Sequence, residues 1–170
     1  VYGINTEPAS TFATTNVVYD SVDKAIKGAK DYDKAASKYV QFLTGKDQAD
    51  WSLVVLQNQA LAQGDAYKNF YKTDYKATTN DWKTNLQLPC SWTRQGFDFS
   101  IYTNVTMPWQ SKYDSNVSAP NAPAKYSPVG LYRKTFKVTD DMKAANGRVY
   151  LSFQGVESSY YVYVNGKEVG

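Results

Sequence analysis

Residues 129–170, VGLYRKTFKVTDDMKAANGRVYLSFQGVESSYYVYVNGKEVG, carry the clearest indication of the fold class. Three short runs within it alternate apolar with polar residues, namely 129–138, 148–153 and 158–164. Alternation with a period of two is the pattern of strands that bury one face. Asn165-Gly166 separates the third run from residues 167–170 and is typical of a type I′ hairpin turn. Short strands joined by turn signals predict an antiparallel β-sandwich.

The alternation also predicts which side chains of this stretch lie in the core. On the run at 148–153 the residues expected to face inward are Val149, Leu151 and Phe153. On the run at 129–138 the shared apolar face consists of Tyr132, Phe136 and Val138, with the charged Lys134 as an exception. Residues 140–145 predict a connector of a single helical turn between the two runs.

Upstream, residues 51–57 (WSLVVLQ) are rich in β-branched side chains and predict a buried strand. Leu86 and Leu88 begin a further strand that Pro89 ends, because proline cannot donate to a strand ladder. Trp82 is expected to anchor its loop to the core, where the indole N–H needs a hydrogen-bond partner.

The first 36 residues differ in pattern from the rest of the chain. Residues 1–19 show no period and predict an extended arm. Residues 21–36 carry apolar side chains at helical spacing, and Ser21 can cap the resulting short helix. We therefore predict an arm with a short helix at residues 1–36 and a β-sandwich at residues 37–170.

Composition excludes several classes of function. A length of 170 residues allows one domain with its own core. The net charge is +3, and the 19 Lys and Arg residues are scattered, so a nucleic-acid partner is not expected. No apolar run reaches the ~20 residues of a membrane helix. Histidine is absent, which excludes Ser-His-Asp and Cys-His catalysis within this chain, and the single Cys90 allows no intrachain disulfide.

Residues 88–108, LPCSWTRQGFDFSIYTNVTMP, are the most informative run for function. They have little periodicity, and long aperiodic stretches inside a domain tend to be functional or disordered. Their aromatic content argues against disorder, because disordered segments lack large apolar side chains. We predict an ordered loop system that lies across a β scaffold.

Several motifs resemble the N-terminal domain of glycoside hydrolase family 2 β-galactosidases. They are P-x-x-W-x-x-x-G-F-D at 89–98, IYTNV at 101–105, G-x-Y-R-x-x-F at 130–136, F-x-G-V-x-S-x-x-Y-V at 153–162 and V-N-G-x-x-V-G at 164–170. The resemblance implies a jelly-roll sugar-binding domain in an enzyme that hydrolyses terminal β-D-galactosides with retention. It also implies further strands after Gly170. A departure from the family is the polar insertion KDQAD at residues 46–50.

The resemblance implies one substrate contact, because Asn104 occupies the position of an asparagine that binds the galactosyl unit. An amide both donates and accepts, which matches a sugar hydroxyl. The resemblance places the two catalytic glutamates in a downstream barrel domain, so no catalytic residue is expected here, and Asp98 and Glu157 are expected to brace turns. The aromatic residues that could stack on sugar or form a domain interface are Trp92, Phe97, Phe99, Tyr102 and Trp109.

The expected partners are a galactoside, the remainder of the parent enzyme with its missing sandwich strands, and further copies of the chain. No membrane partner is expected. No cofactor is expected in this chain, since the resemblance puts the Mg²⁺ and Na⁺ sites of the parent elsewhere. Two alternatives stay open: a stand-alone carbohydrate-binding or surface-adhesion module, and a β-glucuronidase or β-mannosidase of the same family. The compartment is open between the bacterial cytoplasm and a secreted or cell-surface location, with secretion slightly favoured.

Overall fold

The computed structural model describes residues 17–31, 37–45, 48–98, 121, 123–157 and 159–170. The chain divides into two compact units, one of residues 1–43 with 135–170 and the other of residues 44–134. No helix in the described part of the chain is long and apolar enough to cross a membrane. The predicted boundary between residues 36 and 37 stays a prediction.

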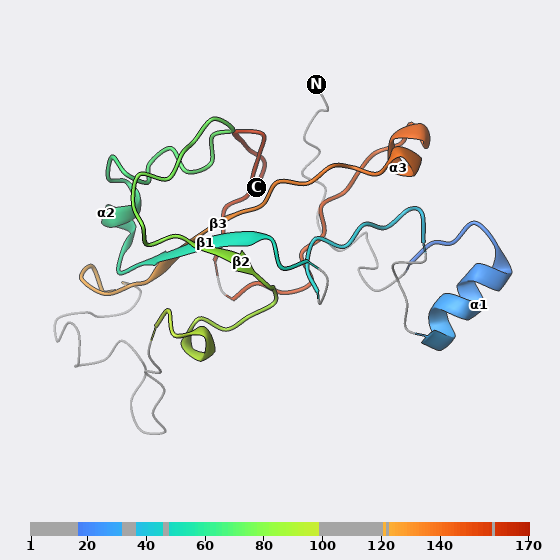
Figure 1. Cartoon of the computed structure of the whole chain (residues 1–170), viewed down its shortest axis with the longest axis horizontal. Coiled ribbons are helices and arrows are strands. Elements are labelled where there is room, and N and C mark those ends of the chain that lie inside the picture. Colours follow the sequence, from blue (N-terminus) through green and yellow to red (C-terminus); the bar gives the residue numbers. More distant parts are fainter. Residues whose placement is uncertain (1–16, 32–36, 46–47, 99–120, 122, 158) are drawn as a thin grey trace. The chain divides into compact units, whose positions relative to one another are not determined.

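Residues 44–134 are built on a three-stranded antiparallel sheet in the order β2-β1-β3 (Figure 1). The strands are β1 (Trp51–Leu56), β2 (Lys83–Leu86) and β3 (Val129–Arg133). Consecutive pairs join β1 to β3, from Ser52 opposite Arg133 to Leu56 opposite Val129. The predicted strand at residues 51–57 is confirmed as the central strand.

The core of this unit lies on β1. Leu53 is 0% exposed and Val54 is 2% exposed, and successive side chains of a strand point to opposite faces. Both faces of β1 are therefore covered at this point. Leu56 and Leu131 complete the buried cluster with Val54. Helix α2 (Gln59–Ala62) follows β1 directly and begins at Asn58, whose side chain accepts a hydrogen bond from the Leu61 N–H.

Trp82 anchors the loop before β2, as the sequence predicts. Its ring packs against the cluster of Val54, Leu56 and Leu131 and lies 5.9 Å from the ring of Tyr75. The expectation that its indole N–H has a partner is wrong, because Nε1 is buried and has no hydrogen-bond partner among the described residues. The Trp82 ring packs against the aliphatic side chains of this cluster, so apolar packing and not a hydrogen bond anchors the loop.

Lys134 interrupts the apolar pattern because it holds part of the inserted loop. Its side chain is only 3% exposed. The Nζ atom donates to the Asp50 carboxylate and, at 3.0 Å, to the side-chain oxygen of Gln48. The ammonium also lies 5.6 Å from the centre of the Trp51 ring. A buried charge needs such partners, so Lys134 fixes residues 48–50 to the end of β3.

The other unit contains two helices and a hairpin. The helices are α1 (Val22–Asp31) and α3 (Asp140–Ala144), and the hairpin pairs β4 (Tyr163–Val164) with β5 (Lys167–Glu168). The predicted hairpin turn is confirmed, because Asn165 has φ 50° and Gly166 has φ 79°, as a type I′ turn requires. The predicted helical connector at 140–145 is confirmed as α3. The Ser21 side chain accepts from the Lys24 N–H at the start of α1, as expected of a cap.

Residues 148–153 do not form the predicted strand. Val149, Leu151 and Phe153 do not face inward and are 54%, 45% and 42% exposed. The reason is that no described strand pairs with this run, and an unpaired strand has neither ladder hydrogen bonds nor an apolar layer to pack against. The strands predicted at 129–138 and 158–164 are shorter than expected for the same reason, and β3 ends at Arg133.

The fold class is mainly β and antiparallel, as predicted from the sequence. Both sheets are antiparallel and the accompanying helices are short. The described strands close no barrel, and the arrangement is consistent with an incomplete β-sandwich.

We expect Asp50→Ala to lower the free energy of unfolding by about 2 kcal/mol, because it leaves the buried ammonium of Lys134 without its carboxylate. The matched control is Asp65→Ala, which breaks an ion pair with Lys68 whose side chains are 95% and 52% exposed. That change should cost clearly less, because a solvent-exposed ion pair contributes little to stability. Urea unfolding followed by tryptophan fluorescence measures both variants, and equal losses would contradict the role assigned to Lys134.

Candidate functional site

The residues singled out for function fall partly within the described chain. Trp92 and Phe97 are described. The other members of the predicted set lie outside the described residues, namely Phe99, Tyr102, Asn104 and Trp109. The structure therefore describes the two segments that flank the predicted site, residues 88–98 and 123–128.

Trp92 is fixed against β3. It directly precedes η3 (Thr93–Gln95), a single 3-10 turn that ends at Gly96 with a positive φ of 76°. Its Nε1 donates a hydrogen bond to the Tyr132 hydroxyl. Its ring edge faces Gly130, where a Cβ atom would lie 2.5 Å from Cζ2 of Trp92. Trp92 can occupy this position because residue 130 has no side chain.

Tyr132 contacts two tryptophans. Its ring centre lies 6.4 Å from that of Trp51 at an interplanar angle of 82°, the edge-to-face geometry that aromatic pairs favour. Burial raises the pKa of the Tyr132 phenol, so the hydroxyl stays neutral while it accepts the bond from Trp92. Trp92 thus contacts β3 through its indole N–H and one edge of its ring. Its predicted role in sugar stacking or at a domain interface stays a prediction.

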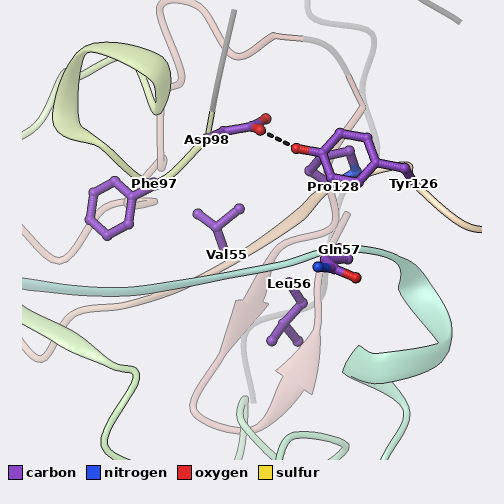
Figure 2. A pocket seen from close by; sticks show the side chains of 7 residues that line it. All are labelled: Val55, Leu56, Gln57, Phe97, Asp98, Tyr126 and Pro128. Carbon is purple, nitrogen blue, oxygen red and sulfur yellow. Dashed lines mark hydrogen bonds between the residues drawn. The ribbon is translucent and has the colours of Figure 1, made fainter. Parts of the chain in front are cut away.

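Phe97 and Asp98 line a small hollow beside the end of β1 (Figure 2). The other lining residues are Val55, Leu56, Gln57, Tyr126 and Pro128. The Tyr126 hydroxyl donates to Asp98 Oδ1 on one side of the hollow. Figure 2 shows the Val55 side chain below Asp98 and to the right of Phe97. Segments from before and after residues 99–120 therefore meet at the end of β1.

The hollow is too small to hold a sugar ring. Its volume is about 40 Å³, which is room for a few water molecules. Pockets for small molecules have volumes of about 300–1,000 Å³. We therefore regard the hollow as a junction between chain segments and not as a substrate pocket.

The described residues offer limited catalytic chemistry of their own. Asp98 accepts a hydrogen bond from Tyr126, and Glu157 belongs to the other compact unit and is exposed. Burial raises the pKa of the Cys90 thiol, which makes it a poor nucleophile at neutral pH. Within the described part of the chain, no three acidic, cysteine or histidine side chains gather as a metal site would require.

Sequence reasoning missed the roles of Gly130 and Tyr126. A glycine inside a strand often marks the close approach of another group, so the sequence did contain a signal for Gly130. Tyr126 lies between the predicted loop and the predicted strand, and no local pattern indicates that it bonds to Asp98, 28 positions earlier.

Comparison with known proteins gives a consistent set of relatives. The sequence model of "Glycosyl hydrolases family 2, sugar binding domain" matches residues 54–170. The β-galactosidase of Priestia megaterium is 38% identical to this chain over 89% of its length. The β-galactosidase of Clostridium acetobutylicum is 34% identical over 76% of this chain. The β-galactosidase of Streptococcus thermophilus is 31% identical over 86% of this chain. The chain spans 13% of the length of each of these relatives. No solved structure matches the chain significantly.

We expect Gly130→Ala to lower the free energy of unfolding by about 2 kcal/mol. The added methyl group would lie 2.5 Å from the ring of Trp92 and 2.9 Å from that of Tyr132, so one ring must move. Gly155→Ala is the control, because a Cβ at that position meets nothing within 4 Å, and it should cost less than about 0.5 kcal/mol. Chemical unfolding measures both, and an unchanged stability of Gly130→Ala would rule out the close contact with Trp92.

Proposed function

Because the chain belongs to the family 2 glycosyl hydrolase sugar-binding domain family, we propose that it is the N-terminal β-sandwich portion of a β-galactosidase. The proposed parent enzyme hydrolyses terminal β-D-galactosides with retention. The observation that carries the proposal is that relatives similar over 76–89% of this chain are named β-galactosidases. Since the chain spans 13% of their length, the activity is proposed for a longer parent.

The role proposed for the chain within that enzyme is support of the active site. Retaining hydrolysis uses two carboxyl groups about 5 Å apart. We propose that both belong to a barrel domain of the parent, together with its Mg²⁺ and Na⁺ sites. Among the described acids, Asp98 is the closest in sequence to the expected substrate contact, Asn104. Its carboxylate accepts a hydrogen bond from the Tyr126 hydroxyl, which supports a structural role for Asp98.

Asn104 is the residue that the chain is proposed to contribute to substrate binding. It follows Asp98 by six residues, and a chain of that length extends at most about 20 Å from Asp98. Its side-chain amide can donate a hydrogen bond to one sugar hydroxyl and accept a hydrogen bond from another. Support comes from the matching IYTNV motif and from the contacts that fix the flanking residues Trp92 and Tyr126.

The remainder of the parent is also the proposed partner of the exposed run at residues 148–164. This run contains apolar side chains such as Val149, 54% exposed, and Tyr161, 72% exposed. Exposed apolar side chains at strand spacing need a second layer to cover them. We propose that the remaining sandwich strands of the parent supply that layer, and a homo-oligomer is the alternative.

We expect the isolated 170-residue chain to cleave no chromogenic galactoside and to bind galactose or lactose no more tightly than millimolar. A single amide contact cannot supply the roughly −8 kcal/mol that micromolar binding requires. A hydrolysis assay and a calorimetric titration measure the two properties. Hydrolysis by the isolated chain would overturn the supporting role, and micromolar binding would favour a stand-alone carbohydrate-binding module.

We expect Asn104→Ala in the full-length parent to lower kcat/KM for a galactoside by about 10- to 100-fold, because one hydrogen bond to the sugar is lost. Asn121→Ala is the matched control, since Asn121 is an exposed asparagine near the end of the same segment. Steady-state kinetics measure both variants. A wild-type kcat/KM in Asn104→Ala would remove the proposed substrate contact.

A further inference from the structure

We propose that residues 148–153 of this chain pair with the same residues of a second copy, as two antiparallel strands related by a two-fold axis. The proposal concerns the 170-residue chain by itself. It goes beyond the proposed function, which assigns this run to the remaining sandwich strands of the parent. A second copy takes the place of those strands where they are absent.

The run at residues 148–153 connects α3 to the segment before the β4–β5 hairpin (Figure 1). Its apolar side chains, Val149, Leu151 and Phe153, are exposed. Their alternate spacing places all three on one face of a strand. No strand in the described part of the chain pairs with the run. The run therefore has the apolar face of a strand without a partner strand among the described residues.

The exposed apolar surface continues after Phe153. The Phe153 ring centre lies 5.2 Å from that of Tyr160, at an interplanar angle of 42°. Tyr160 is itself exposed, and so is Val156, which lies between the two in the sequence. Exposed apolar side chains that gather in this way mark an interaction site. A partner for this surface must supply apolar side chains of its own.

The run lacks the residues that keep a strand unpaired. Sheet edges that stay free of other chains commonly carry lysine, proline or inward-pointing charges. Between Arg148 and Glu157 the chain contains neither a charged residue nor a proline. Valine, tyrosine and phenylalanine, which all occur in the run, favour strands. Pairing of this run with another strand is therefore unopposed.

A second copy fits because the run is complementary to itself in an antiparallel register. With Leu151 on the two-fold axis, the two Leu151 side chains face each other and each Val149 faces Phe153 of the other copy. Directly opposite residues lie on the same face of an antiparallel pair and stabilise it when both are apolar. The three apolar side chains of each copy thus form one continuous face. An interface of this symmetry closes at the dimer.

The charges at the two ends of the run favour the antiparallel arrangement. Arg148 begins the run and Glu157 follows it, and both are exposed. Antiparallel pairing brings the Arg148 end of each copy to the Glu157 end of the other, where opposite charges attract. Parallel pairing would place Arg148 beside Arg148, and like charges directly opposite each other are destabilising. Charge complementarity therefore supports a second copy in the proposed orientation.

The test is sedimentation velocity of the 170-residue chain over a series of concentrations. We expect the wild-type mass to rise from 19.1 kDa toward twice that value as the concentration increases. Leu151→Lys should raise the dissociation constant of the dimer by about tenfold or more, because two ammonium groups then face each other across the axis. The matched control is Leu61→Lys on α2, since Leu61 is 47% exposed and Leu151 is 45% exposed. Leu61→Lys should dimerise like the wild type.

Cross-linking tests the register in a Cys90→Ala background, which removes the single native thiol. Leu151→Cys should form an intermolecular disulfide in air, because the two residues face each other on the axis. Val149→Cys should not, since the two copies of position 149 lie four residues apart along the strands, about 13 Å. A disulfide needs Cα atoms within about 7 Å of each other. Non-reducing gel electrophoresis measures both variants.

The outcomes separate this proposal from the proposed function. A wild-type chain that stays monomeric at every concentration, or a dimer that Leu151→Lys leaves unchanged, would overturn the pairing. Cross-linking of Val149→Cys in preference to Leu151→Cys would overturn the register. The proposed function depends instead on the kinetics of Asn104→Ala in the full-length parent. Dimerisation as expected, together with wild-type kinetics of Asn104→Ala, would support the pairing and overturn the substrate contact.

Discussion

The pairing of β1 with β3 organises the described part of residues 44–134. It brings Leu131 opposite Val54 and buries both. The end of β3 then attaches three loops: Tyr132 accepts from Trp92, Arg133 donates to the carbonyls of Phe70 and Lys72, and Lys134 binds Asp50. A small sheet can therefore order long connecting segments, because polar and aromatic side chains at one strand end each bind a different loop.

The sequence predicts the parts of the fold that depend on adjacent residues. The strand at 51–57 and the turn at Asn165-Gly166 follow from side-chain chemistry within a few positions, and both are confirmed. The strand predicted at 148–153 depends on a partner strand, which the described residues do not provide. Alternation alone was therefore insufficient there. Lys134 was an unexplained exception in the sequence, because its partner Asp50 is distant in the chain.

For the candidate site, a sequence motif predicts a substrate contact at Asn104 but does not predict the contacts of the segments that flank residues 99–120. The bond from Tyr126 to Asp98 joins residues 28 positions apart, and nothing in either local sequence predicts it. Gly130 could be recognised as a place of close approach, but the group that approaches, Trp92, is known only from the fold. Motifs thus predict a contact residue, while the contacts of the flanking segments depend on long-range packing.

In the proposed enzyme, this chain presents Asn104 to an active site built by the rest of the parent. The most direct measurement is a crystal structure of the full-length parent with a bound galactoside. We expect the Asn104 side-chain amide to lie within about 2.7–3.2 Å of a hydroxyl of the terminal galactosyl unit. A galactosyl unit bound against Trp92 and Phe97, with Asn104 beyond hydrogen-bonding reach, would contradict the claim.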